Sequence, residues 1–295
     1  MPPAPKNALQ LGPITLQPGG SADLNLRIAL LLWGDFGTGK TTFAATAPGR
    51  KLWINVDPDG YAAIAKRKDI VVADVSQLDN ETFFKQLQGE NPLGLDQYLA
   101  DHSDIDTVVF DSVTAVRDRA LHRAVDMRAG AGKGFNPTIE VPGQTAYGAR
   151  NQIVLECVSG ILRVTAAHNR HVVMVAHEDA PVTNEQGIVE LITMSLGGKM
   201  LQGMGWRLSE IWYFSQSDTG TKNRRIAVKP TRLRRPMKTR MFQDSTTAEF
   251  DILYDATKPD KGQEKWTLSG WYDQWRRGNG EKIPLPVNAN TGVKK

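Results

Sequence analysis

The feature that most constrains the fold lies between residues 27 and 42, which read RIALLLWGDFGTGKTT. Residues 28–33 form an unbroken apolar run, which suits a fully buried strand. The pattern Gly34-x-x-x-x-Gly39-Lys40-Thr41 follows at once and is that of a phosphate-binding loop. Strand, loop and helix stand in the order that such a loop requires, so the sequence predicts a nucleotide site. The alternative is a glycine-rich turn without a ligand.

The chemistry of a triphosphate explains this spacing. Because glycine has no Cβ, successive backbone N–H groups can turn inward and form a concave nest for an anion. A helix expected from Gly39 to the Pro48-Gly49 stop adds its own unpaired N–H groups. Lys40 is predicted to hold the β- and γ-phosphates, and the Thr41 hydroxyl to ligate Mg²⁺. The predicted nucleotide-binding residues are Gly34, Asp35, Phe36, Gly37, Thr38, Gly39, Lys40, Thr41 and Thr42.

Two carboxylates follow later apolar runs. Asp111 ends residues 106–111 (DTVVFD), where a carboxylate at the end of a strand can hold Mg²⁺; a helix N-cap is the alternative. Asp57 follows residues 51–56 and is the candidate to orient or deprotonate the water that attacks the γ-phosphate. Its alternative is a turn residue, and Asp59 is the reserve candidate.

The run 171–176 (HVVMVA) ends at His177 and Glu178. A neutral imidazole there can donate to the γ-phosphate and report its presence to the following loop. Glu178 can share that role, and a capping or surface group is the alternative. The guanine-reading sequence Asn-Lys-x-Asp does not occur in the chain, which favours ATP over GTP.

The bulk composition is that of a soluble globular protein, because 40% of the 295 residues are apolar and 23% are charged. There is no run of 18 apolar residues and no signal-like N-terminus, so we expect no membrane association and a cytoplasmic location. Cys157 is the only cysteine, which excludes internal disulfides and suits a reducing compartment.

Apolar runs alternate with helical patterns and are followed by a series of strands, which predicts an α/β fold with a mostly parallel sheet and antiparallel strands at the C-terminal side. Residues 1–24 are predicted to be an N-terminal arm, 25–255 the core, and 256–295 a tail with a short helix at 268–276. We also expect a short helix at 61–66 and a strand within 232–242. Glycine-rich or polar loops are expected at 129–144 and 179–198.

Positive charge is concentrated in one segment. Residues 222–240 hold nine Lys or Arg and no acid, so the rest of the chain carries 4 − 9 = −5. This pattern predicts one basic surface that meets an anion.

The ordered set GDFGTGKTTFAATAPG, KLWINVDPDG, DTVVFDSVT, HVVMVAHED and RRIAVKPTRLRR resembles the RecA-like core ATPases of bacteriophages, including the Sak-type single-strand annealing and recombination group. The resemblance covers roughly residues 25–245. It implies a RecA-type P-loop sheet with the His177 strand between the phosphate-loop and Asp111 strands, and ATP with Mg²⁺ as cofactors. Asp57 matches the position of the family's water-activating acid, which is usually Glu. Because Asp is one methylene shorter than Glu, the resemblance leaves the efficiency of hydrolysis open.

The resemblance also implies binding of single-stranded DNA and assembly into a homo-oligomeric filament or ring, with a phage or host single-strand-binding protein as a further partner. The loops at 129–144 and 179–198 match the two DNA-facing loops. A basic residue of the 222–240 segment can instead reach the ATP of a neighbouring subunit, and a solvated strand face is the third interpretation. The DNA-binding or trans-acting candidates are Arg128, Lys133, Lys199, Arg224, Arg225, Lys229, Arg232, Arg234 and Arg235.

Two other functions stay open at this point. One is a ring-forming helicase or loader built on the same core. The other is a slow, ATP-dependent interaction module that docks a partner through Trp266, Trp271 and Trp275, for which a packed C-terminal helix is the alternative.

Overall fold

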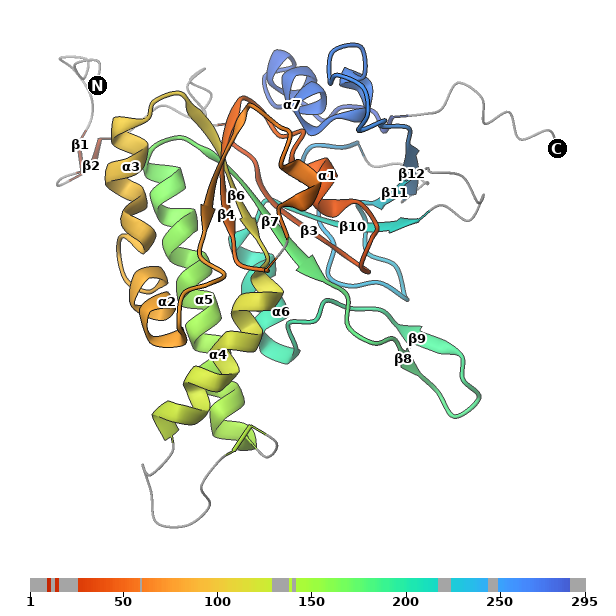
Figure 1. The fold of residues 1–295 in the computed structure, drawn as a ribbon. Coiled ribbons are helices and arrows are strands. Elements are labelled where there is room, and N and C mark those ends of the chain that lie inside the picture. Colours follow the sequence, from red (N-terminus) through yellow and green to blue (C-terminus); the bar gives the residue numbers. More distant parts are fainter. Residues whose placement is uncertain are drawn as a thin grey trace.

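An eight-stranded sheet runs through the centre of the computed structural model (Figure 1), which describes residues 10–11, 14–15, 26–58, 60–128, 138–139, 142–216, 224–243 and 249–286. The spatial order of its strands is β12-β11-β10-β3-β7-β6-β4-β5. The strands from β10 to β5 are parallel to their neighbours, and β11 and β12 are antiparallel. The strands are β3 (Ala29–Gly34), β4 (Arg50–Asn55), β5 (Ile70–Asp74), β6 (Ile105–Asp111), β7 (His171–His177), β10 (Glu210–Gln216), β11 (Arg224–Ala227) and β12 (Glu249–Ile252).

This topology confirms the predicted α/β fold with a mostly parallel sheet and antiparallel strands at its C-terminal side. It also confirms that β7 lies between β3 and β6. Because parallel strands need a crossover, long connections carry the chain from one strand to the next, and most of them contain helices. The carboxyl ends of β3, β4, β6 and β7 therefore lie side by side where these strands end, and we call this side of the sheet the carboxyl edge.

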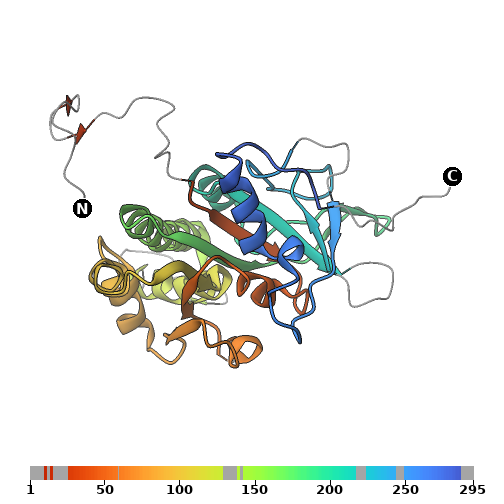
Figure 2. The ribbon, with the colours of Figure 1, turned by 90° about the horizontal axis from the view of Figure 1, so that it is seen from above.

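Helices cover both faces of the sheet (Figures 1 and 2). Alternation along β3 explains why both faces are apolar: Leu31 and Trp33 pack on one side, and Leu30 and Leu32 on the other. The first face carries α2 to α6 and the second carries α1 and α7. The helices are α1 (Lys40–Ala44), α2 (Asn80–Leu87), α3 (Leu95–Asp101), α4 (Val113–Arg128), α5 (Gly143–Ala167), α6 (Gly198–Arg207) and α7 (Leu268–Arg277), with 3₁₀ turns at Ala62–Ile64, Pro92–Gly94 and Glu264–Trp266.

The C-terminal helix α7 packs onto the second face instead of standing free. Trp266, Trp271 and Trp275 are buried there, and the Trp271 ring centroid lies 5.3 Å from that of Phe43 in α1. Aromatic rings at such separations add packing energy beyond simple burial. The prediction of a packed C-terminal helix is confirmed, and the three indoles offer no docking surface.

Three local predictions were wrong. Residues 232–242 form no strand and make only isolated bridges, because Pro236 lacks a backbone N–H and cannot donate to a ladder. The strand that pairs with β11 at the edge of the sheet is β12, where Phe250 and Ile252 both face the core, a pattern that the prediction missed. The helix expected at 61–66 is a single 3₁₀ turn, and α1 ends at Ala44, well before Pro48.

Two short antiparallel pairs lie outside the central sheet: β1 (Gln10–Leu11) with β2 (Ile14–Thr15), and β8 (Val182–Thr183) with β9 (Val189–Leu191). The second pair forms a hairpin that leaves the carboxyl end of β7 and projects from the body (Figure 1). Most of the loop expected at 129–144, and the end of the chain from 287, lie outside the described residues. Within the described residues, no helix has the length and apolarity needed to cross a membrane.

Candidate active site

The loop between β3 and α1 has the backbone that a phosphate nest requires. Gly37 and Gly39 have φ angles of 69° and 92°, which residues with a Cβ rarely adopt. At Gly34 the reason is space, because a Cβ would lie 2.0 Å from the carbonyl oxygen of Phe214 in β10. The glycines predicted from the sequence pattern therefore each have a structural cause.

Lys40 lies buried over this loop. Its Nζ donates to the carbonyl oxygens of Gly34, at 2.9 Å, and Asp35, at 2.6 Å, and lies 3.5 Å from the Thr38 hydroxyl. Burial lowers the pKa of Lys40 to about 8, against the opposing effect of Asp111 and Asp35. A triphosphate would supply this ammonium with the anionic partner that two neutral carbonyls do not.

The two predicted magnesium ligands are in direct contact. The Thr41 hydroxyl donates to Asp111 Oδ2 at 3.0 Å, although the residues are 70 positions apart in the sequence. Burial raises the pKa of Asp111 to about 6. A hydroxyl and a carboxylate are hard oxygen donors, and Mg²⁺ commonly uses one or two such ligands together with phosphate oxygens and water. These residues therefore fit Mg²⁺, and the part of the chain that the structure describes has no cluster of three or more His, Cys, Asp or Glu side chains placed to hold a metal.

Asp57 and His177 approach each other at the same edge. His177 Nε2 lies 3.9 Å from Asp57 Oδ2, and its buried Nδ1 has no hydrogen-bond partner. The ring of Phe36, which is 69% exposed, stacks on the imidazole with centroids 4.3 Å apart. The backbone of Asp57 also forms a turn, because its carbonyl oxygen accepts from the backbone N–H of Gly60 at 3.1 Å. The turn interpretation is thus correct for the backbone, while the side chain faces the site.

Glu178 turns away from this pair. Its Oε2 accepts a hydrogen bond of 2.9 Å from the Tyr213 hydroxyl in β10, and burial raises the pKa of Glu178. The guanidinium of Arg234 lies 4.7 Å from the centre of the Tyr213 ring and is paired with Glu249. Tyr213 was not predicted from the sequence, because the first five residues of β10 are all buried and no pattern distinguishes it from its neighbours.

Comparison with known families agrees with this geometry. A model of the family described as "AAA domain" matches residues 26–232, which is more than half of the chain. The chain belongs to this AAA domain family. No curated protein matches its sequence.

The AAA domain family is one of P-loop ATPases, so nucleotide binding and an ATPase role follow at that level. The phosphate loop, Asp57, Asp111 and His177 all lie inside the matched range. The resemblance to P-loop ATPases is therefore confirmed, and its narrower phage and recombination aspects stay predictions.

The basic segment does not form the single surface that its charge pattern predicted. At the carboxyl edge, Arg224 lies against the phosphate loop, since a Cβ on Gly39 would be 2.9 Å from Arg224 Nε. Arg225 pairs with Asp251 at 2.9 Å. The local reason is that β11 runs from the carboxyl edge, and the chain then crosses the sheet to its opposite edge.

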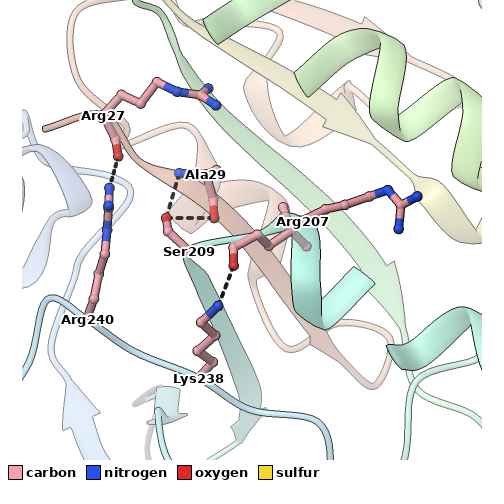
Figure 3. Close-up of a pocket in the computed structure, with 7 residues that line it drawn as sticks. Arg27, Ala29, Arg207, Ser209, Lys238 and Arg240 are labelled. Carbon is pink, nitrogen blue, oxygen red and sulfur yellow. Dashed lines mark hydrogen bonds between the residues drawn. The ribbon is translucent and has the colours of Figure 1, made fainter. Parts of the chain in front are cut away.

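That opposite edge, the amino edge, holds Lys238 and Arg240, which line a cavity together with Arg27 and Arg207 (Figure 3). Lys238 Nζ donates to the carbonyl oxygen of Leu208 at 3.0 Å, and Arg240 Nη2 donates to that of Arg27. In Figure 3 the guanidinium groups of Arg27 and Arg207 end well apart, and Arg207 Nε donates to Ser159 Oγ at 2.8 Å. The cations around this cavity do not converge on a common point.

The other DNA-binding candidates divide into those whose side chains the structure describes and those whose side chains it does not. Arg232 and Arg235 are exposed, and Lys229 is half-buried. Lys133 and the reserve candidate Asp59 lie outside the described residues, as do the side chains of Arg128 and Lys199.

Proposed function

We propose that this chain is an Mg²⁺-dependent ATPase that binds single-stranded DNA and acts in the recombination of a bacteriophage. The observation that carries the proposal is the contact between Thr41 and Asp111 beside the buried Lys40. A hydroxyl, a carboxylate and an ammonium gathered on a glycine nest are the groups that hold a metal-bound triphosphate.

Each residue has a defined role in the proposed reaction. Mg²⁺, when held by Thr41 and Asp111, neutralises charge on the phosphates. The loop amides and Lys40 hold the β- and γ-phosphates, and Asp57 accepts a proton from the attacking water. His177 donates to the γ-phosphate, which suits its unpartnered Nδ1 and its position beside Asp57.

The DNA-binding part of the proposal is supported by side chains at one side of the body. Arg232 and Arg235 are exposed, and the indole of Trp206 in α6 is 81% exposed beside Arg235 in the same surface groove. Cations contact phosphates and an exposed aromatic ring can stack on a base, which together suit a single strand. The β8–β9 hairpin would form part of this surface.

Assembly into a homo-oligomer is part of the same proposal. Lys229 and Arg232 are the candidates to reach the ATP of a neighbouring subunit, in the manner of an arginine finger. Arg232 is exposed, whereas Arg224 lies against the phosphate loop of its own chain and Arg234 is paired with Glu249. A phage or host single-strand-binding protein is the further partner that we propose.

The test is an ATPase titration with and without single-stranded DNA at several salt concentrations. We expect ATP turnover to rise with DNA, and the DNA affinity to fall steeply with salt because bound counterions are released. An ATP turnover rate that does not change when DNA is added, together with no gel shift at low salt, would refute the DNA-binding part of the proposal. The ATPase assignment would then still stand. Strand displacement in the same samples would favour the helicase alternative.

A further inference from the structure

A second cavity adjoins the phosphate loop on the side away from Asp111. It has a volume of about 470 Å³, and Gly39, Thr42 and Phe43 form its inner side. Residues 252–257, which follow directly from β12, form its outer side. We call this segment the 252–257 wall. The base and ribose of a nucleotide fit a cavity of this size, which is within the range of small-molecule sites.

The wall offers a suitable surface for a base. Ile252, Leu253 and Ala256 line the cavity together with Phe43, and Leu253 is 43% exposed. A flat heterocycle between such side chains would remove apolar surface from water on both of its faces.

The wall is fixed in place by two sets of bonds. Gln263 is buried, accepts from the backbone N–H of Asp255 at 2.7 Å and donates to the carbonyl of Asp255 at 3.1 Å. Tyr254 donates to Asp260 at 2.7 Å, and Asp260 is paired with Arg67.

The second set of bonds reaches the phosphate-loop helix itself. Arg67 Nη2 also donates, at 3.1 Å, to the carbonyl of Ala45 at the end of α1. The wall is therefore braced against the helix that carries Lys40 and Thr41, and the cavity is formed before any ligand arrives.

Arg224 stands where the cavity meets the phosphate loop. Its side chain lines the cavity and also contacts Gly39. Gly39 is the last residue of the nest before α1, and the cavity lies directly beyond it. A cation at this point would therefore meet the phosphate nearest the ribose. This position gives Arg224 a role toward the nucleotide of its own subunit.

We propose that the base and ribose of the nucleotide bind against the 252–257 wall, and that Arg224 contacts the α-phosphate in cis. This inference rests on the proposed function, because it assumes a triphosphate on the Lys40 loop. The wall lies beyond residue 232, where the family match ends, so base recognition would come from a part of this chain that the family model does not cover.

The experiment compares the affinities for Mg²⁺-ATP and Mg²⁺-tripolyphosphate by calorimetry, in the full chain. Tripolyphosphate has the three phosphates but no base or ribose. We expect Leu253→Ala to weaken ATP binding about fivefold and to leave tripolyphosphate binding unchanged. Arg224→Ala should weaken both about tenfold, because both ligands occupy the α-phosphate position.

The matched control is Leu233→Ala, since Leu233 is equally exposed at 43% and lies outside the cavity. It should change neither affinity. An unchanged ATP affinity in Leu253→Ala, or an equal loss of both ligands, would overturn the inference. Wild-type protein that binds ATP no better than tripolyphosphate would overturn it as well, whereas wild-type protein that binds neither ligand would refute the proposed function.

Discussion

The two edges of the central sheet use the same kinds of charged side chain in opposite ways. At the carboxyl edge, burial lowers the pKa of Lys40 to about 8 and raises that of Asp111 to about 6. Both shifts mean that burial makes the charged forms of Lys40 and Asp111 less favourable than they are in water. At the amino edge burial also lowers the pKa of Arg240, but its guanidinium has the Glu210 carboxylate 3.9 Å away as a charged partner. Lys238 and Arg240 also donate to backbone carbonyls that tie the 232–242 segment to the strand starts.

The difference separates binding groups from structural ones. A triphosphate and Mg²⁺ would repay the desolvation of Lys40 and Asp111, so these groups are placed for a ligand. Lys238 and Arg240 already have partners whose number and position are fixed by the fold. Local charge density alone would have assigned both sets to one anion-binding surface.

The sharpest test of the comparison is Lys40→Ala against Lys238→Ala. We expect the first variant to lose about 10²–10³-fold in ATP affinity, because a charge-assisted contact to two phosphates disappears. The second should bind ATP as the wild type does. Titration calorimetry measures both, and retained affinity in Lys40→Ala would contradict the role given to the carboxyl edge.

Within the carboxyl edge, Asp57→Asn should separate binding from chemistry. The amide keeps the size and the turn of Asp57 but cannot accept a proton, so turnover should fall at least about 100-fold while ATP affinity is kept. Single-turnover kinetics provide the readout. A normal rate would move the role of the base to Asp59.

The raised pKa of Asp111 predicts a pH dependence. Below about pH 6 the carboxyl group is protonated, so the apparent Mg²⁺ affinity should fall about tenfold for each pH unit. Magnesium titrations of the ATPase rate, repeated at intervals of about one pH unit from about pH 5 to about pH 8, would measure this slope. A slope that persists in Asp111→Asn would place the titrating group elsewhere.

The same shift predicts a gain of stability when the charge is removed. The folded chain holds the Asp111 proton more tightly than an unfolded chain, so stability from this group is present at low pH and is lost as the pH rises through about 4 to 6. Asp111→Asn should therefore raise the free energy of unfolding at pH 7.5 by about 3 kcal/mol. Denaturant unfolding without nucleotide is the measurement, and a lower midpoint would contradict the desolvation account.

At the amino edge the expected effect is smaller and purely structural. Arg240→Ala removes the bond to the Arg27 carbonyl, the 3.9 Å ion pair with the buried Glu210 carboxylate, and the contact of the guanidinium with the Trp275 ring, at 4.9 Å. We expect a loss of about 1 kcal/mol, or roughly 2 °C in Tm, with unchanged ATP affinity. A large change in ATP affinity would show that the two edges are coupled.

The sequence alone determined the parts of the site whose residues are adjacent in the chain. The glycines, Lys40 and Thr41 stand in one short pattern, and apolar runs that end in Asp57, Asp111 and His177 predicted polar side chains at strand ends. The structure adds that these ends share one edge, because a parallel sheet brings the carboxyl ends of its strands together. The fold class was predictable for the same reason.

Only the tertiary structure decided which distant residues meet. The contact of Arg224 with Gly39, the bond from Tyr213 to Glu178 and the division of the basic segment between two edges depend on strand order and crossover paths. Composition records how many charges a segment has, but long-range packing decides the partner and the dielectric surroundings of each one. That is why the 222–240 segment was conspicuous in the sequence and its individual cations acquired their separate roles only in the fold.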